Sequence, residues 1–124
     1  MKTRPRDLER LKSVTEAAWL TASQKLREKA DEERAATERL KKLAQDREAA
    51  LQQITSAEGI DVAQVLSTTR WLRWCDRERA RQNMVVARLR AELEQEQGAA
   101  RRTFAKDNAL SKLIIQAAAG KKGR

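Results

Sequence analysis

The sequence predicts an all-α fold, a long antiparallel two-helix coiled-coil hairpin that forms a single domain over residues 1–124. The chain has 124 residues, of which 36% are charged and 3% are aromatic, with one Pro and four Gly. That composition is typical of long helices and coiled coils. Apolar residues recur at three- and four-residue steps along two long stretches. One turn signal, TSAEGID at residues 55–61, separates them and places the tip of the hairpin near Gly59.

The first helix is predicted from residue 5 to residue 55. Pro5 suits the first turn of a helix, and Asp7 places negative charge near the positive end of the helix dipole. Polar residues interrupt the apolar stripe, and in a coiled coil such residues loosen the packing or set the register. The stripe comprises Leu8, Leu11, Val14, Ala18, Ala22, Leu26, Ala36, Leu40, Leu43, Leu51 and Ile54, interrupted by Thr15, Lys25, Lys29, Glu33 and Arg47.

The turn is predicted at residues 56–61. Gly59 can adopt the left-handed conformation that ends a helix, and Asp61 can cap the helix that follows. A short linker between two long helices makes them antiparallel neighbours. If the chain folds about Gly59, facing residues have numbers that sum to about 118. This register places Phe104 opposite Val14, Leu93 opposite Leu26, and Cys75 opposite Leu43.

The second helix is predicted over residues 62–118, followed by a basic tail at residues 119–124. Gly98 weakens a helix by about 1 kcal/mol relative to Ala, so it is the candidate break point. The apolar stripe is closer to a heptad repeat than to a 3.6-residue period. It consists of Trp71, Leu72, Cys75, Val86, Leu89, Leu93, Ala100 and Phe104.

The residue types exclude several function classes. The chain has no His and one Cys, so it cannot assemble the usual zinc ligand sets, a catalytic triad or an intrachain disulfide. No Gly-rich phosphate loop is present, and we expect no enzyme activity, cofactor or metal. No apolar run approaches the roughly 18 residues of a membrane span, and the N-terminus lacks a secretory signal. We therefore expect a cytoplasmic protein, in which Cys75 is a buried structural thiol and Trp19 packs against the core.

The positive charge of the chain is concentrated on the second helix. The net charge is +9, and residues 59–124 carry 14 Lys or Arg against 7 Asp or Glu. Five arginines share one side of this helix, with a tryptophan beside them. Such a row can grip an acidic surface or phosphates, although a charge run is more often a solvated face. The candidate partner-binding face, here named the Arg face, consists of Arg70, Arg73, Trp74, Arg77, Arg81 and Arg88.

Residues 70–113 resemble the C-terminal half of FliJ-type flagellar export proteins, in particular their alphaproteobacterial branch. Three runs carry the resemblance: W-L-x-W with Arg79, N-M-x-x-A-R-L-R-A at residues 83–91, and R-x-F-x-K-x-x-A-L at residues 102–110. The resemblance implies a non-enzymatic central stalk of a type III export apparatus, an antiparallel coiled coil similar to the gamma subunit of rotary ATP synthases. It also implies that the end with both termini inserts into the hexameric export ATPase, and that other surfaces meet the export gate and chaperones. The protein would then associate with membrane-embedded machinery.

Two other functions remain open from the sequence. An isoelectric point near 10.3 suits a coiled coil that binds nucleic acid through the Arg face and the tail. Alternatively, an imperfect apolar seam suits a structural coiled coil that forms a homo-oligomeric scaffold. The sequence does not determine the oligomeric state.

Overall fold

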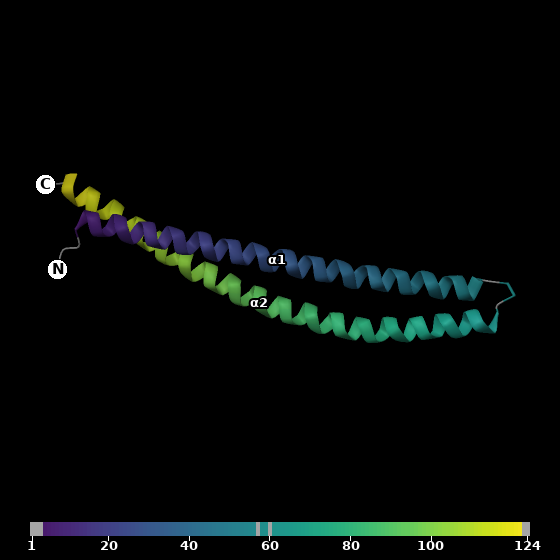
Figure 1. Cartoon of the computed structure of the whole chain (residues 1–124). Coiled ribbons are helices and arrows are strands. Elements are labelled where there is room, and N and C mark those ends of the chain that lie inside the picture. The colour runs from purple at the N-terminus through teal and green to yellow at the C-terminus, as the bar shows by residue number, and fades with distance from the viewer. Residues whose placement is uncertain (1–3, 57, 60, 123–124) are drawn as a thin grey trace. The chain divides into compact units, whose positions relative to one another are not determined.

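The computed structural model describes residues 4–56, 58–59 and 61–122. It contains two helices, α1 (Pro5–Ser56) and α2 (Val62–Lys122), which run antiparallel and pack against each other (Figure 1). The described residues contain no strand. The predicted all-α helical hairpin is therefore confirmed, and both helices begin at the residue that the sequence predicts.

The turn and the start of α2 have the backbone conformation and the cap expected from the sequence. The backbone carbonyl of Arg4 accepts the N–H groups of Asp7 and Leu8 at the start of α1, at 3.0 and 3.2 Å. Gly59 has a φ of +74°, the left-handed conformation that its position in the turn requires. At the start of α2, the Asp61 carboxylate accepts the N–H of Ala63 at 3.3 Å, which satisfies one of the free donors of that helix.

Helix α2 differs from its prediction in two places. It is continuous through Gly98, because the cost of one glycine is small compared with the cooperative stability of a long packed helix. It also extends to Lys122, four residues beyond the predicted end at residue 118. Three consecutive alanines at residues 117–119 favour this extension. The last part of the predicted basic tail, residues 123–124, lies outside the described residues.

The contacts between the two helices form two compact units. Unit 1 contains residues 4–30 and 92–122, and unit 2 contains the described residues between 31 and 91. In unit 2 the side chain of Cys75 is fully buried. The buried residues Ala36, Val86 and Leu89 also form a cluster there, against which Leu40 and Val85 pack. In unit 1, Ala22 and Leu110 are buried.

The register of the hairpin differs from the prediction. Phe104 contacts Trp19, with ring centroids 6.1 Å apart, whereas Val14 is 66% exposed. The ring pair and the polar contacts between the helices join residues whose numbers sum to 119–123. Every Cα–Cβ bond in a helix tilts toward its N-terminus, so each side chain covers the surface about one residue before its own Cα. In an antiparallel pair the two tilts add, which raises the sum by about two, and the long Arg, Trp and Phe side chains of the pairs that sum to 123 reach further along the axis.

Candidate partner-binding face

The core of unit 2 determines which face of α2 points outward. Cys75, Val86 and Leu89 are buried and share one side of the helix. The Arg face lies on the opposite side by helical periodicity. Burial of three side chains on one side therefore orients the arginines away from α1.

The structure brings all six predicted residues to one exposed face of unit 2. Every residue of the Arg face is exposed, whereas Trp71 is only partly exposed. The side chain of Arg81 is 71% exposed, and Trp74, a large apolar residue, is 47% exposed. The sequence left open whether these arginines are accessible, and their exposure answers that question.

The two carboxylates beside the Arg face are already paired, one with Arg81 of the face itself and the other with a residue of α1. Arg81 Nη2 lies 2.6 Å from Glu78 Oε1, and Gln82 donates to the same oxygen at 3.0 Å. The hydrogen bond from Arg81 is the main reason why the pKa of Glu78 is lowered. On the other flank, Asp76 pairs with Arg47 of α1 at 2.9 Å. Within the described residues, Arg70, Arg73 and Arg77 have no ion pair of their own.

Exposed apolar residues lie on the same side as the arginines, and the charge pattern alone did not identify them. Leu66 is 55% exposed and Met84 is 74% exposed. They belong to a series with strictly alternating four- and three-residue steps, which is the spacing of a coiled-coil seam. All residues of this series are exposed. We name it the outer seam of α2: Leu66, Arg70, Arg73, Arg77, Ala80, Met84, Ala87 and Ala91.

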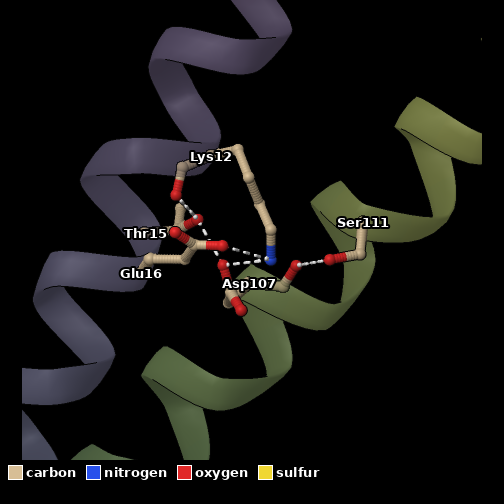
Figure 2. Close-up of polar contacts among 5 residues, drawn as sticks. All are labelled: Lys12, Thr15, Glu16, Asp107 and Ser111. Atoms are coloured by element: carbon tan, nitrogen blue, oxygen red, sulfur yellow. Dashed lines mark hydrogen bonds and ion pairs between the residues drawn. The ribbon is translucent and has the colours of Figure 1, made fainter.

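In unit 1, a polar cluster joins α1 to α2 (Figure 2). Lys12 Nζ and the Thr15 hydroxyl each donate to Asp107 Oδ1 at 2.7 Å. Lys12 also lies 3.6 Å from Glu16, and the Ser111 hydroxyl donates to the Asp107 carbonyl oxygen at 3.1 Å. The hydrogen bond between Lys12 and Asp107 lowers the pKa of the carboxyl and raises the pKa of the amine.

Further polar contacts between the helices use residues that interrupt the predicted apolar stripe. Lys29 pairs with Glu92 at 2.9 Å in unit 1. In unit 2, Arg90 Nε lies 3.1 Å from Glu33 Oε1, and Arg47 pairs with Asp76. Donation from Arg90, followed by donation from Thr37, lowers the pKa of Glu33. Four of the five interruptions therefore make specific contacts with α2, as register-setting residues do: Thr15, Lys29, Glu33 and Arg47. Lys25 is exposed.

Cys75 has the environment of a structural thiol. Its side chain is fully buried, and burial is the main reason why its pKa is raised above the ordinary thiol value. A protonated, inaccessible thiol is a poor nucleophile. Three or more potential metal ligands do not gather anywhere in the described part of the chain.

Comparison of the chain with models of protein families, with curated proteins and with solved structures finds no match. Among the described residues, neither helix has a stretch that is long and apolar enough to cross a membrane. The described residues present two candidate surfaces, an exposed basic face on unit 2 and exposed apolar side chains on unit 1.

Proposed function

We propose that this chain is a non-enzymatic coiled-coil stalk of a flagellar type III export apparatus, and that it binds the export ATPase. The antiparallel two-helix hairpin is the observation that carries this proposal, since it is the architecture that the resemblance of residues 70–113 to FliJ-type proteins implies. A helix pair held by ion pairs along its length is suited to a mechanical coupling role.

Unit 1 is the surface that we assign to the ATPase. It contains the start of α1 and the end of α2, the part of the chain that the resemblance places inside the ring. Several of its apolar side chains are largely exposed, among them Val14 at 66% and Ile115 at 67%. Exposed apolar side chains of this kind are the ones that a partner covers on binding.

The test is titration of the full chain into the hexameric export ATPase of the same organism. Sedimentation and the rate of ATP hydrolysis are followed together at physiological salt. We expect binding at micromolar concentration, and about tenfold weaker binding for the double variant Val14→Ser/Ile115→Ser. Val62→Ser is the control, because this side chain is 72% exposed but lies in unit 2 and is not part of the outer seam. Failure of the unaltered chain to bind would refute the proposal.

Nucleic-acid binding is the second candidate function, and the exposed Arg face is the observation that favours it. Binding through phosphate contacts weakens linearly on a plot of log affinity against log salt concentration. Titration of a fluorescent 20-base-pair duplex at several salt concentrations tests this function. The arginines of this face are flanked by exposed Leu66 and Met84, which are a poor match to a phosphate backbone, so the ATPase remains our first choice.

A homo-oligomeric scaffold is the remaining alternative. The exposed apolar residues of unit 1 favour it, because a second copy of the chain would cover them equally well. Sedimentation of the chain alone decides this point, since a monomer across the micromolar range would exclude such a scaffold.

A further inference from the structure

The outer seam of α2 has the geometry of a helix-binding surface. Its steps from Leu66 to Ala91 alternate strictly between four and three residues, so its members form one continuous line along the helix. The opposite side of α2 has the same kind of spacing and packs against α1. Helix α2 therefore has two seams, and within unit 2 the residues of the outer one are exposed.

The seam has a basic centre between apolar positions. Arg70, Arg73 and Arg77 occupy three consecutive seam positions, and Leu66 and Met84 lie beyond them on either side. The large apolar side chain of Trp74 lies along the edge of this line. The two carboxylates of residues 62–91, Asp76 and Glu78, lie on the flanks and are held by Arg47 and Arg81. Among the described residues, no carboxylate forms an ion pair with Arg70, Arg73 or Arg77 at the centre of the seam.

We propose that the outer seam of α2 binds an acidic helix of a partner protein, with Asp or Glu opposite Arg70, Arg73 and Arg77 and apolar residues opposite Leu66 and Met84. The contact runs from Leu66 to Met84, which is 18 steps of about 1.5 Å, or about 27 Å of helix. Arg is well suited to this role because its guanidinium group binds a carboxylate through two parallel hydrogen bonds. Complementary charge then sets the register and speeds the encounter, while the apolar ends and Trp74 contribute buried area.

The arrangement of charge favours an acidic helix over other anionic partners. A helix that lies on a membrane has apolar residues at the centre of its binding face and cations at the edges. Here the arginines occupy the centre. A nucleic acid would use the arginines but would leave Leu66 and Met84 unmatched, because these side chains are suited to neither phosphates nor base edges. This inference goes beyond the proposed function, since it concerns unit 2 and does not depend on the export ATPase.

The probe is a synthetic three-heptad peptide with Glu at the central seam positions and Leu at the outer ones. A scrambled peptide of identical composition, in which Glu and Leu form no seam, is its control. Binding of each fluorescein-labelled peptide to the full chain is followed by anisotropy. We expect the seam peptide to bind about tenfold or more tightly than the scrambled one, and both to weaken as salt is raised.

Variants of the chain assign the binding to the outer seam. Arg73→Glu/Arg77→Glu reverses the charge at its centre, and we expect at least a tenfold loss of affinity. Arg39→Glu/Lys42→Glu is the matched control, because it makes the same change in net charge on exposed residues of α1 in unit 2. Leu66→Ala/Met84→Ala changes only exposed apolar residues, and we expect about a threefold to tenfold loss. Circular dichroism verifies that every variant is as helical as the unaltered chain.

Several results would overturn the proposal. Equal affinity for the seam and scrambled peptides would show that the face attracts any polyanion. Tighter binding of a 20-base-pair duplex or of phosphatidylglycerol vesicles would assign the face to nucleic acid or to lipid. Self-association that Arg73→Glu/Arg77→Glu abolishes would make a second copy of this chain the occupant. A chain that binds the export ATPase but not the seam peptide would refute this inference and leave the proposed function intact.

Discussion

Replacing Leu89 with Ala tests whether the small cluster in unit 2 stabilises the hairpin. Leu89 is 7% exposed and packs with Ala36 and Val86. The substitution removes three carbon atoms, each worth about 0.8 kcal/mol when buried, so the transfer contribution is about 2.4 kcal/mol. The cavity adds to this loss, but only partly, because a core between two helices can relax into the space. We expect the free energy of unfolding to fall by about 3 kcal/mol.

The expected loss is large enough to measure by urea or thermal unfolding. For 124 residues the entropy of unfolding is about 0.26 kcal/mol per kelvin, so the midpoint should fall by about 10 °C. Met84→Ala is the control, because Met84 is on the same helix but is 74% exposed, and we expect a change of about 0.5 kcal/mol or less. Ala is the best helix former, so a change in helix propensity cannot cause a loss of stability in either the Leu89→Ala or the Met84→Ala variant. Equal effects of the two substitutions would refute this account of the core.

Four more predictions concern single residues. Gly98→Ala should raise the free energy of unfolding by about 1 kcal/mol, because a Cβ there meets only the flexible end of one arginine side chain. Gly59→Ala should lower the free energy of unfolding, because the φ of Gly59 is +74°. The urea midpoints check both predictions, and a more stable Gly59→Ala variant would contradict the turn geometry. Asp107→Asn should flatten the acid side of the stability profile, measured between pH 2 and pH 6. The folded pKa of Asp107 lies below its ordinary value of 3.8, so its contribution is present above that value and is lost as pH falls through the folded pKa; an unchanged profile would show that the cluster adds nothing. Cys75 should react with a disulfide reagent only as fast as the chain opens, and rapid reaction in the native state would contradict its burial.

The sequence predicted the hairpin because its signals are local. Gly59 and Asp61 specify a turn and a cap through their own backbone preferences, and no distant residue has to be known. Continuity at Gly98 was harder to predict, because the cost of one glycine must be weighed against the packing of the whole helix. The pairing of Phe104 with Trp19 was missed because a count of residues around the turn ignores the tilt of side chains along each helix and the reach of two large rings along the axis.

The candidate site was predicted in part. Helical periodicity placed the six residues of the Arg face on one side, and this needs only the angle between successive residues. Their exposure could not be derived in the same way, because it depends on which side of α2 packs against α1. The apolar members of the outer seam, Leu66 and Met84, were overlooked because the sequence was searched there for charge rather than for three- and four-residue spacing.

The ion pairs between α1 and α2 also disfavour alternative alignments of the two helices. An apolar seam that repeats every seven residues matches itself again after a slip of one heptad, so apolar packing alone distinguishes such alignments poorly. Here, a slip of α2 by seven residues in either direction brings an uncharged residue into the place of each of four charged partners. Asp107 gives way to Ala100 or Ile114, Glu92 to Val85 or Ala99, Arg90 to Asn83 or Gln97, and Asp76 to Thr69 or Asn83. Each slipped alignment therefore forfeits all four pairs at once, which selects one alignment from a repeating series.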